Sequence, residues 1–276
     1  MANTPSPILS VICPTLESPV AYLDRLEKII EDSLESASRV YEFYTANLFE
    51  IIFVVPPSFT WVEIRRPYSI RVFQDLGIGI YQALNIGIKN ALGDKIVIIN
   101  IDDWGNLYDL VQVCLRNSSN SQELFYGDTL LNSGSGYIYE IRGTTISDTI
   151  DLARMPGSHQ AQIINKSMYI KLGYFYSKIR VGIFDLKLKY ASDFEFYCRT
   201  VSTGATWVYD DNILLNQMIG GATTRHWLRT SMEIYLISFK YGSKTPRHLS
   251  FLLKCFLGAI YFHHFKRYLH LIRKGK

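Results

Sequence analysis

Short apolar runs alternate with stretches of helical spacing along the first hundred residues of the chain. Uninterrupted Val/Ile-rich runs predict strands that are buried on both faces, as in parallel sheets. The expected strands cover residues 8–13, 49–55, 70–73 and 95–101, and the expected helices cover residues 19–36 and 80–91. Alternation of strand and helix in this order predicts a parallel α/β sheet with right-handed crossovers.

Residues at the ends of the two helices support this assignment. Ser18 is a suitable N-cap, and Pro19 then occupies the first helical position, where proline is tolerated. Gly93 follows the second helix and is expected to close it as a left-handed C-terminal residue.

The spacing of apolar residues changes from Glu123 onward. Further strands are expected over residues 124–129, 137–141, 160–164 and 205–209, and helices over residues 166–172 and 193–202. Gly173 is expected to end the first of these helices, and Ser192 to cap the second. A boundary is expected near Gly220-Gly221, which divides the chain into a domain of residues 1–224 and a tail of residues 225–276.

The composition is that of an ordinary globular protein. The 276 residues are 48% hydrophobic and 20% charged, which excludes collagen-like and disordered classes and leaves room for a full core. The four cysteines are far apart and form no metal-binding spacing, so neither a zinc site nor a disulfide framework is expected. The first apolar run is too short for a secretory signal, and we therefore expect a cytoplasmic protein.

Charge is distributed unevenly along the chain. No acidic residue follows Glu233, whereas nine Lys and Arg lie between Lys240 and Lys276, and residues 1–233 carry a net charge of −5. Such a basic end predicts an anionic partner. Because the body lacks a basic, aromatic-studded surface pattern, nucleic acid is not the expected partner.

The basic tail also has an apolar stripe at helical spacing, which begins after Thr245-Pro246. One interpretation is that the stripe packs on the body. The other is an interfacial helix on an anionic membrane surface, at the inner face of the membrane. The longest uncharged apolar run, residues 255–262, is too short to span a bilayer.

Asp102 and Asp103 end the most apolar run of the chain. Ligands of parallel α/β sheets collect at the carboxyl ends of the strands, and two carboxylates there can hold a divalent cation together with substrate phosphates. The alternative is that Asp103 or Asn106 only caps a helix that begins near Leu107.

Several segments, in this order and spacing, resemble the inverting glycosyltransferases of family 2. They are Ser10-Val-Ile-Cys-Pro-Thr15, Gly79-Ile-Tyr-Gln-Ala-Leu-Asn-Ile-Gly-Ile88, Ala91-Leu-Gly-Asp94, Asn100-Ile-Asp-Asp103, His159-Gln160, Ala191-Ser-Asp-Phe-Glu-Phe-Tyr-Cys-Arg199 and Gly220-Gly-Ala-Thr-Thr224. The resemblance covers roughly residues 8–224. Within that family, the chain is similar to the members that act in polysaccharide biosynthesis.

The resemblance implies a GT-A fold, in which a mixed Rossmann-like sheet is flanked by helices, here followed by a helical C-terminal tail. It implies transfer of a sugar from a nucleoside diphosphate sugar to a lipid-linked or polysaccharide acceptor, with Mn²⁺ or Mg²⁺ as cofactor. Asp193 matches the general base, His159 and Gln160 match residues that contact the acceptor or the leaving group, and Asp103 with Asp102 matches the metal motif. The matching nucleotide-sugar contacts are Pro14, Thr15, Glu17, Asp75, Asn85 and Asp102.

Structural interpretations of the same residues remain open. Asp193 could be an ordinary acidic residue at a helix N-terminus, without a catalytic role. Glu195 is a second candidate for the base. His159 could be a core histidine, and Glu17 a solvated loop acid. Tyr81 and Trp207 are expected to pack rather than to bind a sugar.

The chain departs from the family pattern at several places, which include extra residues between Asp75 and Gly79 and between Gly173 and Phe184-Asp185. The second strand ends in Val-Val-Pro56-Pro57 where the family has an aspartate, Gln82 replaces an aspartate, and Ile86 replaces a lysine. These departures define a second hypothesis, a degenerate transferase that binds a nucleotide sugar without catalysis.

Overall fold

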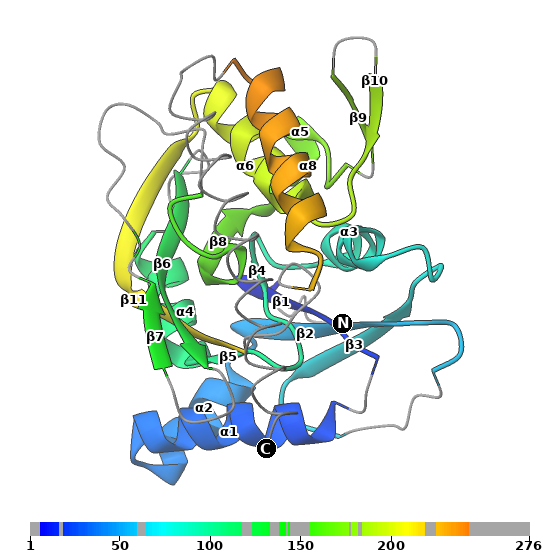
Figure 1. Ribbon diagram of the computed structural model, residues 1–276. Helices are drawn as coiled ribbons and strands as arrows, with labels where there is room; N and C mark the ends of the chain where they lie inside the picture. Colours follow the sequence, from blue (N-terminus) through cyan, green and yellow to red (C-terminus); the bar gives the residue numbers. More distant parts are fainter. Residues whose placement is uncertain are drawn as a thin grey trace, which may run out of the picture.

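The structure of the chain is a computed structural model, which describes residues 6–16, 19–59, 65–117, 123–132, 138–141, 143, 155–176, 178–181, 184–218 and 225–242 (Figure 1). The helices are α1 (Val20–Leu34), α2 (Ala37–Thr45), α3 (Ile80–Asn90), α4 (Leu107–Arg116), α5 (Lys166–Leu172), α6 (Ser192–Ser202) and α8 (Trp227–Lys240), with a short 3₁₀ helix η1 (His159–Ala161). The strands are β1 (Leu9–Pro14), β2 (Phe49–Val55), β3 (Ser69–Gln74), β4 (Lys95–Ile98), β5 (Trp104–Gly105), β6 (Glu123–Asn132), β7 (Ile138–Ile141), β8 (Gln162–Asn165), β9 (Lys178–Val181), β10 (Phe184–Lys187) and β11 (Thr206–Met218).

One mixed sheet organises the described part of the chain. Its strand order is β3-β2-β1-β4-β8-β6-β11-β5, with β7 paired to β6. The first four strands are parallel, as the sequence predicts. Strand β8 is antiparallel to both β4 and β6, whereas β11 returns parallel to β6. The amino end of β8 therefore lies at the same edge of the sheet as the carboxyl end of β4.

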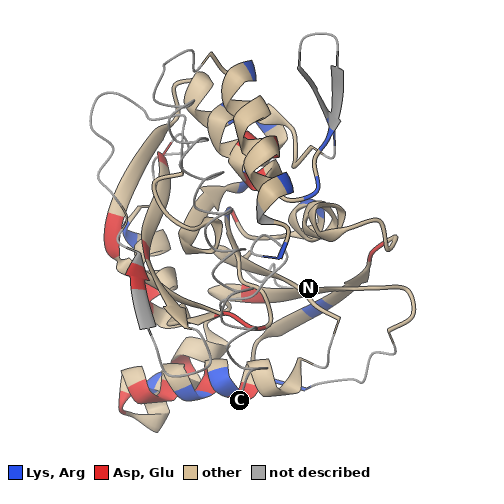
Figure 2. Ribbon diagram, in the orientation of Figure 1, with Lys and Arg blue, Asp and Glu red and all other residues tan. Residues whose placement is uncertain are grey.

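Helices cover both faces of this sheet (Figure 1). Helices α1, α2 and α4 pack on one face around a core that includes Leu23, Phe53 and Leu110. Helices α3, α5 and α6 pack on the other face around a second core that includes Leu84 and Phe196. The outer surfaces of α1 and α2 carry interspersed acidic and basic residues, which is typical of a solvated helix face (Figure 2).

Most elements lie where the hydrophobic pattern predicts them, and the differences have local causes. The strand expected over residues 95–101 ends at Ile98, because Asn100 to Asp103 form a turn in which Asp103 N donates to Asn100 O at 2.9 Å. The start of the strand expected over residues 160–164 is instead η1. The strand expected over residues 205–209 continues to Met218, with a register shift between Tyr209 and Leu214. The polar Asp210-Asp211-Asn212 segment interrupts the apolar pattern, so the sequence does not predict this continuation.

Three expected helix ends are wrong or displaced. Pro19 is itself the N-cap of α1, and Ser18 lies outside the described residues. Helix α3 ends at Asn90, and Gly93 lies beyond it, where an added Cβ would come within 2.8 Å of the backbone of strand β1. The reason for glycine there is close packing on β1. Ser192 does not cap α6, because Ala191 is the N-cap and the Ser192 hydroxyl donates to the Tyr176 carbonyl at 2.5 Å.

Helix α8, which lies beyond the expected domain boundary, packs against α6 (Figure 1). In the part of the chain that the structure describes, no helix combines the length and apolar character needed to cross a membrane. Residues 243–276, with the apolar and basic stripe, lie outside the described residues, as does Gly220–Thr224. The boundary at residue 224 and the amphipathic tail therefore stay predictions.

Candidate functional site

The ends of four parallel strands bring together the segments that the sequence analysis singled out. The hydrogen-bond ladders extend past the strands, with Thr15 N donating to Val54 O at 3.0 Å and Asp75 N to Val55 O at 2.8 Å. Pro14, Thr15, Asp75 and the turn that carries Asp102 therefore follow parallel strands at one edge of the sheet. This is the edge at which open α/β sheets bind ligands.

The two aspartates of the turn have different surroundings. Asp102 is exposed, whereas Asp103 is buried. Asp103 Oδ1 accepts a hydrogen bond from Met218 N at 3.0 Å, and Oδ2 accepts one from Asn100 Nδ2 at 2.9 Å. Asp103 thus ties the end of β4 to the end of β11. The helix that follows is capped by Asn106, whose side chain accepts from Tyr108 N, so Asp103 is not the cap.

Burial raises the pKa of Asp103 above its usual value, although the Met218 and Asn100 hydrogen bonds and the charge of His159 oppose this rise. Each oxygen of Asp103 accepts one hydrogen bond and keeps a further lone pair, because a carboxylate has about four acceptor positions.

The donor set at this turn suits a metal ion only in part. Among the described residues, no three His, Cys, Asp or Glu side chains lie together in a way that would hold a metal. Asp102 and Asp103 offer hard oxygen donors on a turn at the ligand-binding edge. Mg²⁺ typically takes one or two protein carboxylates and completes its coordination with water and substrate phosphates. The two aspartates fit that mode and do not fit a closed protein cage.

Asp193 is in the first turn of α6, and its side chain is turned toward other elements of the fold. Its Oδ2 lies 3.0 Å from Nδ1 of His159, and its Oδ1 accepts a hydrogen bond from the Tyr81 hydroxyl at 2.9 Å. Tyr81 comes from α3 and His159 from η1. Three elements that are distant in sequence therefore converge on one carboxylate.

The pKa of Asp193 lies below its ordinary value. Burial alone would raise this pKa, but the charge and hydrogen bond of His159, the Phe194 N–H and the Tyr81 hydroxyl together outweigh burial. A small cavity lies behind the carboxylate, and apolar side chains such as Ile98 and Phe196 line most of it. Asp193 is thus an ionised carboxylate beside a small, largely apolar cavity.

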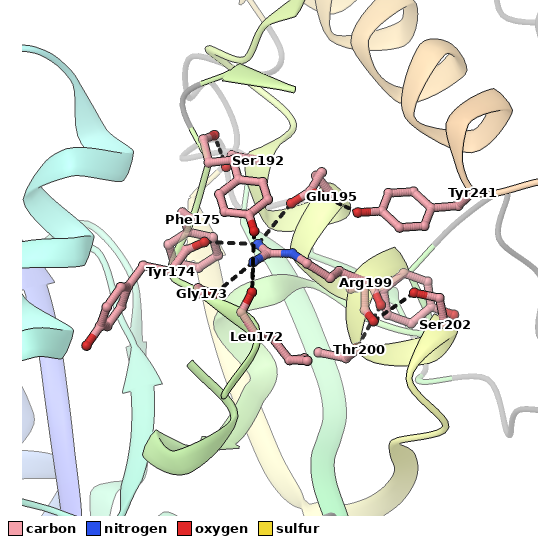
Figure 3. A network of polar contacts seen from close by, with 12 residues as sticks. Leu172, Gly173, Tyr174, Phe175, Ser192, Glu195, Arg199, Thr200, Ser202 and Tyr241 are labelled. Atoms are coloured by element: carbon pink, nitrogen blue, oxygen red, sulfur yellow. Dashed lines mark hydrogen bonds and ion pairs between the residues drawn. The ribbon is translucent and has the colours of Figure 1, made fainter. Parts of the chain in front are cut away.

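Glu195, the rival candidate for the base, is in a different environment. It is fully buried, and Figure 3 shows it between Arg199 and Tyr241. Arg199 donates to Glu195 at 2.9 Å, the Tyr241 hydroxyl donates to the other carboxylate oxygen, and Lys240 Nζ lies 3.7 Å from it. Both oxygens are occupied by structural contacts, so Glu195 is not available to an acceptor.

Arg199 holds this network in place (Figure 3). Its guanidinium donates to the carbonyl oxygens of Leu172, Gly173 and Tyr174 and lies over the Tyr176 ring at 3.8 Å from the centroid. Because this planar group satisfies both a loop backbone and a buried carboxylate, it joins α6 to the end of α5, and Glu195 in turn contacts Lys240 and Tyr241 of the α8 region.

The remaining expected site residues either make contacts with the protein itself or lie outside the described part of the chain. Asp75 caps its own loop, with Oδ1 accepting from Gly77 N at 2.7 Å. Asn85 pairs with the backbone of Phe175 through both its amide oxygen and its amide nitrogen, at 3.0 and 2.9 Å. Gln160 is buried and contacts the Ser158 hydroxyl. Glu17 lies outside the described residues.

Sequence reasoning missed part of what surrounds Asp193. Tyr81 does pack, with its ring 5.6 Å from that of Phe175, but its hydroxyl also contacts Asp193. Trp207 packs as expected, with its ring 5.3 Å from that of Tyr197. No local pattern could have connected Tyr81 to a carboxylate 112 positions further along the chain.

Comparison with known proteins bears on the fold. No protein-family model matches the chain, and no curated protein matches it by sequence. Among solved structures, residues 1–349 of Staphylococcus aureus TarS match with a TM-score of 0.54 and 14% identity, over 90% of this chain and 70% of that one. The same TarS fragment was also solved with UDP-GlcNAc, and it matches with a TM-score of 0.53.

A mannosyltransferase from Pyrobaculum calidifontis, solved with GDP-Man and Mn²⁺, matches with a TM-score of 0.53 and 15% identity, over 91% of this chain and 69% of that one. At this level of identity the similarity establishes architecture. The curled mixed sheet with helices on both faces is that of the GT-A fold, as the sequence analysis expected.

Proposed function

We propose that the chain is an inverting glycosyltransferase that moves a sugar from a nucleoside diphosphate sugar to a lipid-linked or polysaccharide acceptor. The observation that supports this most strongly is the position of His159. It contacts Asp193 at 3.0 Å, and η1, which carries it, packs against both β4 and β11, the two strands whose ends Asp103 connects. A carboxylate suited to accept a proton and a strand-end pair of aspartates suited to a diphosphate thus lie near one histidine in a GT-A fold.

Asp193 acts as the general base in this proposal. It takes the proton of the acceptor hydroxyl while the acceptor oxygen bonds to the anomeric carbon of the donor. The bond from that carbon to the phosphate oxygen breaks, its electron pair leaves with the diphosphate, and the configuration at carbon inverts. The low pKa keeps Asp193 ionised and able to accept a proton at neutral pH, although it also makes the carboxylate a weaker base.

His159 and Tyr81 hold the base in orientation. Each contacts one oxygen of Asp193, which fixes the carboxylate plane and leaves further lone pairs for the acceptor hydroxyl. Gln160, next to His159, is proposed to act on the same side of the site.

Asp102 and Asp103 are proposed to bind Mn²⁺ or Mg²⁺ together with the donor diphosphate. A divalent ion bound there would neutralise the charge that develops on the leaving phosphates. Pro14, Thr15, Glu17, Asp75 and Asn85 are proposed to surround the donor nucleotide. Asn85 would act through the Phe175 backbone that it holds.

The acceptor assignment rests on the basic tail. A protein held at the inner face of the membrane by Lys and Arg residues would meet lipid-linked intermediates at high local concentration. We therefore propose a cytoplasmic protein that associates peripherally with the membrane.

A second candidate is a binding protein without catalysis. The observation that favours it is the end of strand β2, where Pro56 follows Val55 and no acid is available to hold a nucleotide base. In that case the nucleotide would bind but no transfer would follow.

Thermal unfolding with a panel of nucleoside diphosphates, each with and without Mn²⁺, tests the site directly, because a ligand that binds only the folded state raises Tm. Donor hydrolysis and transfer to a broad acceptor panel then separate the two candidates. We expect Mn²⁺-dependent stabilisation together with turnover. Stabilisation without any turnover would favour the binding protein, and the absence of any stabilisation would contradict both.

A further inference from the structure

Helix α6, which carries Asp193, begins without a capping side chain of its own. Its N-cap is Ala191, which has no side chain able to accept a hydrogen bond. Ser192 donates to the Tyr176 carbonyl, and Asp193 is directed at Tyr81 and His159. The free N–H groups at a helix start need acceptors; Asp193 receives that of Phe194, and the N–H groups of the residues just before the helix are left to other partners.

A glutamate from helix α8 supplies the acceptor. The carboxylate of Glu233 accepts hydrogen bonds from Tyr190 N at 2.9 Å, from Ala191 N at 3.1 Å and from Lys189 N at 3.1 Å. Glu233 is only 2% exposed. Ala191 is the N-cap and Lys189 and Tyr190 precede it, so this buried carboxylate fixes the backbone that leads into α6 and complements the helix dipole.

Residues near Glu233 in and before α8 contact the same segment or Glu233 itself. The His226 ring stacks on Tyr190 with 4.9 Å between centroids, and Arg229 Nε lies 3.5 Å from Glu233 Oε1. Glu233 is also the last acidic residue of the chain. The segment 189–191 is thus held entirely from a helix beyond the boundary that the sequence suggests.

We propose that Glu233 is the positioning residue for Asp193. A carboxylate that receives three backbone N–H groups fixes the backbone of that segment. Because Glu233 fixes residues 189–191, directly before α6, it sets the position from which Asp193 reaches His159 and Tyr81. This inference rests on the proposed role of Asp193 as the base, and it makes α8 part of the catalytic unit.

The structure offers a matched control at the other contact between the same two helices. Tyr241, just after α8, donates to Glu195 in the first turn of α6 (Figure 3). Tyr241→Phe therefore removes a contact between α6 and the end of α8 and leaves the hydrogen bonds of Glu233 to residues 189–191 in place. Arg229→Gln is a second control, since it removes a neighbour of Glu233 and leaves the backbone hydrogen bonds in place.

The test compares Glu233→Gln with these two controls. A carboxamide keeps one acceptor oxygen and puts an N–H₂ group against backbone N–H groups. We expect kcat to fall roughly 10- to 100-fold in Glu233→Gln, the effect of a base displaced by about 1 Å, with KM for the donor nearly unchanged. The controls should keep kcat within about twofold of wild type, because neither removes a hydrogen bond between Glu233 and residues 189–191.

A second measurement does not depend on turnover. Side-chain NMR of His159 reports its hydrogen bond to Asp193, and we expect the Nδ1 proton signal to shift or vanish in Glu233→Gln and to persist in Tyr241→Phe and Arg229→Gln. If Glu233→Gln does not fold, Glu233→Asp replaces it, since that variant keeps the charge and withdraws the oxygens by one methylene.

An unchanged His159 signal in the Glu233 variant would overturn the proposal, as would equal losses of kcat in Glu233→Gln and Tyr241→Phe. If the wild type shows no transfer at all, the proposed function fails, yet the NMR comparison still decides whether Glu233 positions Asp193.

Discussion

Asp193 and His159 face each other between the first turn of α6 and the turn that precedes β8, with Oδ2 of the carboxylate 3.0 Å from Nδ1 of the imidazole. This pair joins two segments that follow the four parallel strands in the chain and meet at the edge where the carboxyl end of β4 lies. The Tyr81 hydroxyl, 2.9 Å from the other carboxylate oxygen, completes the contact. The pair distinguishes Asp193 from an ordinary acid at a helix start, because Asp193 contacts side chains of two other elements in addition to the Phe194 N–H of its own helix.

The first prediction concerns catalysis. Asp193→Asn should keep the affinity for a nucleoside diphosphate sugar and lose transfer by roughly 10²- to 10⁴-fold, the usual contribution of a positioned base. Single-turnover kinetics and calorimetric titration of the donor measure the two quantities. Asp109→Asn is the matched control, since Asp109 also lies in the first turn of a helix, α4, on the other face of the sheet. Equal rates of transfer by Asp193→Asn and Asp109→Asn would show that Asp193 is not the general base.

The second prediction concerns stability and pH. The pKa of Asp193 is lowered in the folded protein, below the value of about 3.9 that an unfolded Asp has. The ionised carboxylate therefore stabilises the fold above that value, and this contribution is lost as pH falls through the folded pKa. We expect the free energy of unfolding of wild type to exceed that of Asp193→Asn by roughly 1–3 kcal/mol at neutral pH. Urea unfolding should show the difference shrinking below about pH 4, and a difference that is constant with pH would contradict the assignment.

The third prediction concerns the metal. Asp102→Asn and Asp103→Asn should each remove most of the Mn²⁺-dependent part of nucleoside diphosphate affinity, because a cation that uses two protein carboxylates loses a charged ligand. Titration calorimetry with and without Mn²⁺ measures this part separately. Asp94→Asn serves as the control, since Asp94 precedes the opposite end of strand β4. Metal-dependent affinity that survives in both variants would show that the aspartates only shape the turn.

The fourth prediction separates structure from catalysis at Glu195. Glu195→Ala should lower the free energy of unfolding by roughly 3–5 kcal/mol, because Arg199 would stay buried without its carboxylate. Since Glu195 contacts Arg199, Lys240 and Tyr241 rather than the site, kcat measured well below Tm should change little. A large fall in kcat at unchanged stability would restore Glu195 as a candidate base.

The sequence predicts those helices and strands that a local pattern of residues determines. Strand β2 and helix α5 are found with the expected bounds, because an unbroken apolar run and a short amphipathic turn ended by Gly173 determine them locally. The placement of Asp102 and Asp103 at the sheet edge follows in the same way from the strand before them. Helix α2 was missed, since its apolar residues extend the pattern of α1 without a clear break.

The contacts around Asp193 lie beyond such reasoning. Ser192 has the chemistry of an N-cap and the correct position next to the helix, yet the helix end is satisfied by Glu233, more than forty residues later. Glu195 has the chemistry of a base, yet Arg199 and Tyr241 occupy it. In each case a contact between distant segments decides which of two neighbouring side chains is available, and only the tertiary arrangement contains that information.

The last prediction concerns the basic tail. Each Lys or Arg near an anionic leaflet contributes about 1 kcal/mol of binding, and salt weakens this attraction over a Debye length. The whole chain should therefore sediment with vesicles that contain anionic lipid, less at high salt, and hardly at all with neutral vesicles.

A shortened chain is the necessary control, and helix α8 decides where it ends. Because Glu233 binds the residues that lead into α6 and Tyr241 binds Glu195 of α6, ending the chain at residue 224 would disturb the helix that carries Asp193. A chain that ends at Gly242 keeps both contacts and removes eight of the nine Lys and Arg that follow Glu233. It should remain folded, retain nucleotide binding and lose vesicle binding. If it instead unfolds, and the whole chain ignores anionic vesicles, then the apolar stripe packs on the body and the membrane proposal is wrong.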